Sequence, residues 1–203
     1  MSQLKDKLNS IIEQYNLMLN EKINLRKIEM QEDNLDHYLI YNILGIDNDE
    51  GFNIDLYQNI GRFLYKYSGS LLEELTSEIF KHKFPNAKTK VKIENTITSK
   101  PKTVEIDVLN ETTAYEIKWR DATTDGDHIN KEHTRLKVIS DKGFKPVRIM
   151  YFMPNRESSI KIQNRIKDIY IQEGGEAYFE QDAWNFVENN LDFDFLSFLK
   201  EVS

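Results

Sequence analysis

The hydrophobic periodicity of the chain changes after Pro85, and this change most constrains its fold. Three successive segments, residues 88–94, 103–109 and 113–119, are rich in β-branched or aromatic residues and alternate between apolar and polar positions. A period of two residues is that of a strand with one buried face. We therefore expect three neighbouring strands, with a turn at residues 110–112 that closes a hairpin between the last two.

Helical spacing dominates the N-terminal third instead. Apolar residues three or four positions apart predict a helix over residues 3–29, a short apolar segment follows at 38–44, and a further amphipathic pattern covers 54–67. The sequence DNDEGFN, which precedes the last pattern, is predicted to be an exposed loop.

The sequence Ser68-Gly69-Ser70 is expected to interrupt this helical pattern. Glycine is unfavourable inside a helix, and Ser70 is a suitable N-cap for a new helix that begins with LLEELTSEIF. We therefore predict separate helices on the two sides of these three residues.

A helix, a buried strand and a second helix are expected after the three strands. The sequence TDGDH is predicted to open a helix that runs to about Asp141. The segment PVRIMYFMP is typical of a strand buried on both faces. A helix over residues 158–173, a short strand over 177–180 and one or two C-terminal helices complete the predicted order. The order predicts one α/β domain with a helical N-terminal layer.

The composition excludes several classes of protein. The 203 residues are 39% hydrophobic and 30% charged, as in soluble globular proteins, and the absence of cysteine excludes disulfides and thiolate metal sites. No apolar run approaches the roughly 20 residues of a membrane span, and the N-terminus lacks the apolar core of a signal peptide. We therefore expect a cytoplasmic protein.

Positive charge is concentrated in one segment of an acidic chain. The formal net charge is −7, yet KHKFPNAKTKVKIENTITSKPK contains seven lysines and only one acidic residue, Glu94. A local concentration of lysine can bind a polyanion even where the total charge is negative. Lysines on an edge strand also prevent aggregation of sheets. The segment therefore indicates either a nucleic-acid-binding surface or a solvated edge strand.

The sequence VEIDVLNETTAYEIKW places acidic residues on two strands expected to be neighbours. Because side chains alternate between faces, Glu105 and Asp107 should lie opposite the apolar residues of their strand, and Glu116 and Lys118 opposite those of theirs. In a hairpin the apolar faces of both strands would enter the core together, and the polar faces would align. The result would be a cluster of carboxylates with one ammonium group.

Such a cluster is unfavourable unless a cation offsets its charge. Like charges on adjacent strands are destabilising, so a purely structural protein gains little from them. Two carboxylates and a backbone carbonyl suit Mg²⁺, which keeps several water molecules for exchange with substrate. A neighbouring lysine can position or deprotonate an attacking water and offset charge that develops on phosphorus oxygens.

Asp107 followed by Glu116-Ile117-Lys118 resembles the D…(E)xK core of the PD-(D/E)xK nuclease superfamily, although the proline of that signature is displaced. The resemblance implies a restriction-endonuclease-like core, a mixed central sheet flanked by helices. It also implies that Asp107, Glu116 and the carbonyl of Ile117 bind Mg²⁺, for which Mn²⁺ can substitute, and that Lys118 is catalytic.

A helix glutamate agrees with the same resemblance. Many nucleases of this superfamily have a glutamate four residues after a glycine on the helix before the sheet, and Gly69 and Glu73 have this spacing. Glu73 is therefore a candidate auxiliary catalytic residue. Glu74 and Glu78 lie close by in sequence, and an ordinary exposed acidic residue remains the alternative for each of the three.

The segment EIKWRDATTDGDHINKEHTRLK resembles a corresponding segment of the ApaLI-like group of type II restriction endonucleases. This resemblance rests mainly on residues 116–137, and the resemblance to the superfamily covers roughly residues 69–153. From both resemblances and the predicted order of elements, we expect one nuclease domain over residues 1–203, with a helical layer at 1–67, a catalytic core at 68–180 and C-terminal helices at 181–203. The candidate DNA-binding residues of the segment carry hydrogen-bonding side chains: Arg120, Thr124, His128, Lys131, His133 and Arg135. A helix N-cap at Asp125 or Asp127 and a solvated helix face would explain part of this composition.

These resemblances imply a Mg²⁺-dependent type II restriction endonuclease that cleaves double-stranded DNA at a short symmetric sequence. A homodimer is expected, because two active sites must address the two strands. Two alternatives remain open from the sequence. One is a repair or recombination nuclease of the same superfamily that acts on branched or damaged DNA, and the other is a non-catalytic DNA-binding protein with a degenerate nuclease fold.

Overall fold

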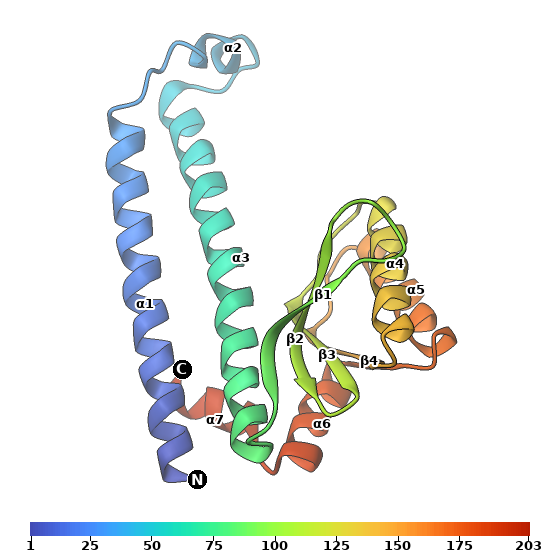
Figure 1. The fold of residues 1–203 in the computed structure, drawn as a ribbon. Helices are drawn as coiled ribbons and strands as arrows, with labels where there is room; N and C mark the ends of the chain where they lie inside the picture. The colour runs from blue at the N-terminus through green and yellow to red at the C-terminus, as the bar shows by residue number, and fades with distance from the viewer. The chain divides into compact units, whose positions relative to one another are not determined.

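The structure, a computed structural model, describes all 203 residues (Figure 1). Its elements are α1 (Ser2–Gln31), α2 (Tyr38–Ile43), α3 (Asn48–Lys83), β1 (Lys88–Glu94), β2 (Thr103–Asn110), β3 (Thr113–Arg120), α4 (Asp127–Asp141), β4 (Lys145–Phe152), α5 (Glu157–Gln172), β5 (Glu176–Phe179), α6 (Gln181–Leu191) and α7 (Phe195–Val202). Two compact units are present: Asp6–Leu71 forms one, and Met1–Lys5 with Leu72–Ser203 forms the other.

The unit Asp6–Leu71 is a helical hairpin. The long helices α1 and α3 lie side by side and run in opposite directions, and α2 lies where the chain turns back between them (Figure 1). Aromatic residues line the contact between the two helices: the rings of Tyr15 and Tyr67 are 6.2 Å apart, and the Arg26 guanidinium lies 5.4 Å from the Phe63 ring. No helix of the chain is both long enough and apolar enough to cross a membrane.

The predicted exposed loop before residue 54 is wrong, because α3 already begins at Asn48. The carboxylate of Asp47 accepts a hydrogen bond of 2.8 Å from the backbone N–H of Glu50, as an N-cap residue does. Asp49 and Glu50 lie in the first turn, where negative charge stabilises a helix. The acidic sequence therefore starts a helix.

The predicted interruption at Ser68-Gly69-Ser70 is also wrong. Helix α3 continues through these residues to Lys83, so Ser70 is not an N-cap. A glycine inside a helix costs about 1 kcal/mol relative to alanine. The helix that follows it has a nearly continuous run of buried side chains over residues 75–80, and the burial of several such side chains exceeds that cost.

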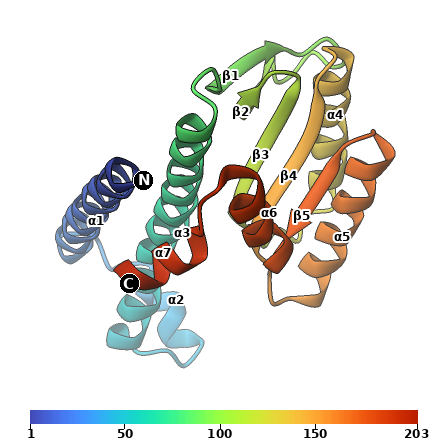
Figure 2. The same ribbon diagram turned by 90° about the horizontal axis from the view of Figure 1, so that it is seen from below.

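The unit Leu72–Ser203 has a five-stranded mixed sheet in the order β1-β2-β3-β4-β5. The pairs β1–β2 and β2–β3 are antiparallel, and β3–β4 and β4–β5 are parallel. Helices α4 and α5 lie on one face of the sheet, and α6 lies on the other (Figure 2). The predicted fold class, a mixed sheet flanked by helices after N-terminal helices, is confirmed.

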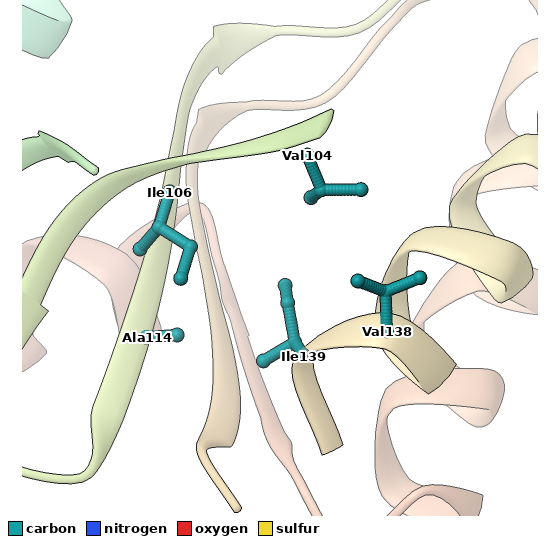
Figure 3. Packing of buried hydrophobic residues seen from close by; sticks show 5 residues of the cluster. All are labelled: Val104, Ile106, Ala114, Val138 and Ile139. Atoms are coloured by element: carbon teal, nitrogen blue, oxygen red, sulfur yellow. The ribbon is translucent and has the colours of Figure 1, made fainter. Parts of the chain in front are cut away.

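The two faces of β3 pack against different elements, whereas the sequence pattern predicts that the hairpin places the apolar faces of β2 and β3 in the core together. Val104 and Ile106 of β2 pack with Ala114 of β3 against Val138 and Ile139 of α4 (Figure 3). Tyr115, the next residue of β3, lies on the opposite face, where its ring is 4.5 Å from the ring of Phe80 on α3. Glu116 of β3 faces α4, where Arg135 forms an ion pair with it.

We predict that Gly175→Ala destabilises the chain by roughly 1–3 kcal/mol, as overpacking does. Gly175 precedes β5, and a Cβ there would lie 2.2 Å from the carbonyl oxygen of Pro146, a backbone atom that cannot rotate away. Urea denaturation measures the effect. Gly61→Ala is the matched control, since a Cβ at this helical position meets no atom within 4 Å, and it should stabilise by about 0.5–1 kcal/mol. Equal stabilities for both variants would contradict the close approach at Gly175.

Candidate active site

Asp107 lies where β2 and β3 separate. The two strands pair only where Val108 to Asn110 of β2 lie opposite Thr113 to Tyr115 of β3. The part of β2 before Val108 and the part of β3 after Tyr115 are still strands, but they do not pair with each other. Across the gap, the Asp107 Oδ2 accepts a hydrogen bond of 2.7 Å from the backbone N–H of Ile117. The carboxylate thus takes the place of a carbonyl in the ladder, and a buried N–H keeps a partner.

The pKa of Asp107 is raised to about 8. Burial is the main cause, because the side chain is only 8% exposed, and the nearby negative charge of Glu116 adds to it. The positive charges of Arg135 and Lys118 act in the opposite direction but do not reverse the shift. In the metal-free protein near neutral pH, Asp107 is therefore largely protonated.

Glu116 is held between two cations. Its Oε1 lies 2.6 Å from Nζ of Lys118, and its Oε2 forms an ion pair with the guanidinium of Arg135 from α4. Burial opposes ionisation of this side chain, but the charges of Arg135 and Lys118 outweigh burial and lower the pKa of Glu116. Arg135 also donates a hydrogen bond of 2.6 Å to the backbone carbonyl of Glu105. The guanidinium therefore links α4 to both strands.

Lys118 remains an ammonium group in this arrangement. The adjacent charge of Glu116 raises the pKa of Lys118, although burial acts against the shift. An ammonium group donates hydrogen bonds and offsets negative charge, and it cannot accept a proton.

These side chains line one cavity of about 670 Å³. Its lining includes Asp107, Glu116 and Lys118, together with residues of α3, α4 and the loop between β1 and β2. The other lining residues are Glu73, Asn95, Thr98, Lys100, Pro101, Thr103, Val104, Glu105, Asp127, Asn130, Lys131, Glu132, Thr134 and Arg135. The cavity thus joins carboxylates from two helices, α3 and α4, and two strands, β2 and β3.

Glu73 lines this cavity, whereas Glu74 and Glu78 do not. Burial raises the pKa of Glu73, and Nζ of Lys90 lies 3.9 Å from its carboxylate. Glu78 forms an ion pair of 2.8 Å with Lys81 on the same helix. Of the three glutamates, only Glu73 therefore shares a space with Asp107.

Several side chains that line the cavity carry carboxylates, the kind of ligand that binds Mg²⁺. No group of three or more histidine or acidic side chains is arranged to hold a metal ion. Asp107 and Glu116 supply two hard carboxylates beside an open space, which matches the few protein ligands that Mg²⁺ takes.

Of the predicted DNA-binding residues, the structure brings only Lys131 and Arg135 to this cavity. Lys131 is exposed at the rim and forms an ion pair of 2.9 Å with Asp127. The side chain of Arg135 is mostly buried and forms an ion pair with Glu116. Its guanidinium is therefore not exposed for a contact with DNA bases.

The other four predicted DNA-binding residues lie outside the cavity lining. Arg120 is partly exposed at the end of β3, and Thr124 is exposed in the segment that follows. Nε2 of His128 lies within hydrogen-bond distance of Oδ2 of Asp121, at 2.9 Å, and Nε2 of His133 lies 3.0 Å from Oε1 of Glu173.

The predicted N-cap of α4 at Asp125 or Asp127 is not found, because Gly126 occupies the N-cap position. Asp125 accepts instead from the backbone N–H of Asp127 at 2.9 Å, so its side chain still stabilises the start of the helix.

A buried charge network beside the site was not predicted. Arg148 of β4 is fully buried and donates to Asp121 at 2.9 Å, Gln163 at 3.1 Å and Glu132 at 3.3 Å. A buried guanidinium requires such partners, because an unpaired buried charge costs several kcal/mol. The network links the end of β3 to α4 and α5. Its signal in the sequence is one arginine within an otherwise apolar strand.

We predict that the raised pKa of Asp107 makes the metal-free protein less stable as pH rises. Above the usual pKa of 3.8 the unfolded chain loses this proton, while the folded chain keeps it up to pH about 8. The folded state then binds more protons, so the free energy of unfolding falls between these two values. Asp107→Asn removes this contribution while keeping an acceptor for Ile117.

Urea denaturation in EDTA measures the free energy of unfolding at several pH values. From about pH 4 to pH 8, the free energy of unfolding of Asp107→Asn should rise relative to that of wild type. Glu105→Gln, an exposed change on the same strand, is the control and should show no such trend. A difference that does not vary with pH would show that Asp107 ionises normally.

The whole chain, residues 1–203, matches the family described as ApaLI-like restriction endonuclease. Neither the curated proteins nor the solved structures contain a match. The family match confirms the resemblance noted for residues 116–137, and it extends that resemblance over the helical hairpin as well. On the match over its full length, the chain belongs to the ApaLI-like restriction endonuclease family.

Proposed function

We propose that the chain is a Mg²⁺-dependent type II restriction endonuclease that hydrolyses phosphodiester bonds of duplex DNA at a short symmetric sequence. The single observation that carries the proposal is the presence of Asp107, Glu116 and Lys118 in one open cavity. Family membership supports the reaction class. We also propose that residues 1–203 act as one nuclease domain, which the family match over both compact units supports.

Asp107 and Glu116, with the carbonyl of Ile117, would hold Mg²⁺. Bound there, Mg²⁺ would polarise the scissile phosphate and lower the pKa of a water molecule. Asp107 must lose its proton to become a ligand, and Glu116 must exchange part of its interaction with Arg135. Metal affinity would therefore depend on pH.

Lys118 would orient the attacking water and offset negative charge on the phosphate oxygens. Its raised pKa favours the ammonium form, which donates hydrogen bonds and stabilises charge in a partly buried site. Glu73 would act from α3 as an auxiliary acid or as part of the hydration shell of the metal. Its place in the cavity lining supports this role.

Double-stranded DNA and a second copy of the chain are the proposed partners. Lys131 at the cavity rim supports a DNA contact beside the catalytic residues, and Arg120, Thr124, His128 and His133 remain further candidates on the same segment. A homodimer would let two equivalent sites address the two strands of a symmetric sequence.

Plasmid DNA incubated with Mg²⁺ and then sequenced at its new ends tests the proposed function. Discrete fragments with a common symmetric sequence at their ends are expected. Preferential cutting of four-way junctions would favour a repair nuclease instead, and binding without cutting would favour a non-catalytic protein.

We predict that Asp107→Asn, Glu116→Gln and Lys118→Ala each lower the single-turnover cleavage rate by at least about 100-fold, or ~2.7 kcal/mol. Asp107→Asn and Glu116→Gln each remove a carboxylate proposed to bind the metal, and Lys118→Ala removes the ammonium group. DNA binding, measured by fluorescence anisotropy in EDTA, should remain. Glu94→Gln, an exposed change on β1, serves as the control with wild-type activity. Cleavage within tenfold of wild type by any of the three would remove that residue from the proposed site.

We further predict that Arg135→Gln makes the protein more dependent on Mg²⁺ for stability. The variant leaves the buried carboxylate of Glu116 with one cation instead of two, which destabilises the metal-free state. Mg²⁺ then replaces the lost charge without competing with the guanidinium. The rise in melting temperature on adding Mg²⁺ should therefore exceed that of wild type. Lys131→Gln, one turn earlier on α4 and 66% exposed, should behave as wild type, and an equal rise in all three proteins would contradict competition by Arg135.

A further inference from the structure

The loop between β1 and β2, residues 95–102, forms one wall of the catalytic cavity. Thr98, Lys100 and Pro101 line the cavity together with Asn130 and Lys131 of α4. In Figure 1 the loop extends beyond the rest of the sheet toward α4. A DNA strand whose phosphate reached Asp107 would therefore pass between this loop and α4.

A single buried side chain defines the shape of this loop. The amide of Asn95 donates to the hydroxyl of Thr98 at 2.9 Å and to the carbonyl of Pro101 at 2.8 Å. Its oxygen accepts from the backbone N–H groups of Ile97 at 3.0 Å and Thr98 at 3.1 Å. The backbone N–H of Asn95 closes the base of the loop on the carbonyl of Lys102 at 2.9 Å. Both donors and the acceptor of the amide are therefore in use.

The surface of the loop is exposed and chemically suited to a DNA groove. Residues 96–100 are all exposed, and three of them carry hydroxyl groups: Thr96, Thr98 and Ser99. Ile97 is a large apolar side chain that is 43% exposed. Hydroxyl groups bond to base edges or phosphates, and apolar side chains contact the thymine methyl group. Lys100 and Lys102 add positive charge next to these residues.

We propose that residues 96–100 contact duplex DNA beside the scissile phosphodiester. Ile97 and Lys100 make the contact, and Asn95 is a positioning residue that sets the specificity of cleavage by holding them in one conformation. A loop already held in its bound shape loses less conformational entropy on binding, and it discriminates better between partners. This inference rests on the proposed function, because it takes DNA as the substrate.

A thiol placed on the loop tests the contact without any need for cleavage. The chain has no cysteine, so Ile97→Cys introduces one reactive group at the loop. Ile171→Cys is the matched control, since Ile171 is an exposed isoleucine on α5, 58% exposed, away from the cavity lining. The rate of modification by a maleimide is measured with and without linear plasmid DNA, in EDTA at low salt.

Plasmid DNA at about ten times its dissociation constant should slow modification of Cys at position 97 about tenfold, because about one molecule in ten is then free. Modification at position 171 should be unchanged. Equal rates at position 97 with and without DNA would overturn the proposal. The two proposals separate cleanly: cleavage by wild type without protection at position 97 contradicts only the loop contact, and protection without cleavage contradicts only the nuclease activity.

The role of Asn95 is tested by the selectivity of cleavage. Asn95→Ala removes four hydrogen bonds of its amide, and Asn95→Asp keeps the two accepted from the backbone. The ratio of cleavage at the preferred sequence to cleavage at sequences with one altered base pair should fall about tenfold in Asn95→Ala, within the range for one lost base contact. Asn95→Asp should lie between this variant and wild type. Cleavage that falls equally at all sequences would show that Asn95 is only structural and would overturn its assignment.

Discussion

The buried carboxylate of Glu116 is the group on which the arrangement of β2, β3 and α4 around the cavity depends. A carboxylate with only 4% of its surface exposed is costly unless cations compensate it, and here one cation comes from its own strand and the other from α4. The Arg135 guanidinium that neutralises Glu116 also binds the backbone of β2. Arg135 therefore both offsets the charge of Glu116 and helps to hold α4 on the sheet.

This balance explains how two acidic residues coexist near each other without a metal ion. Glu116 keeps its charge because two cations face it, and Asp107 gives up its charge because burial and Glu116 raise its pKa. The cluster is therefore stable before any divalent cation binds. In the proposed function, a metal ion would have to release the proton of Asp107 and displace part of the Arg135 interaction, so that metal binding and protonation would be coupled.

The pairing of β2 with β3 stops short of Asp107, which leaves its side chain free to enter the cavity lining. If the pairing of Val108 with Tyr115 continued, Asp107 would face Glu116 directly within a closed ladder. The strands diverge instead, and the Asp107 carboxylate accepts a hydrogen bond from the buried backbone N–H of Ile117, which would otherwise lack a partner on β2. The cavity next to Asp107 is also lined by the loop between β1 and β2, residues 95–102, and by α4.

The local pattern of the sequence determined the strands and most of the helices, and it marked the residues that we propose as catalytic. Alternation predicted β1, β2 and β3 within one residue of their ends, and the resemblance to the PD-(D/E)xK core implied a shared role for Asp107, Glu116 and Lys118. These features depend on neighbours along the chain or on one hairpin. Helix α3 was misjudged because its acidic start resembles a loop, and because burial beyond Gly69 outweighs the local preference of Ser-Gly-Ser. Only the tertiary structure decided that α4 covers the polar face of β3, that Arg135 binds Glu116 and that Arg148 joins Asp121 to Glu132. The physical reason is that a buried charge selects its partner by distance in space, and residues far apart in sequence supply that partner.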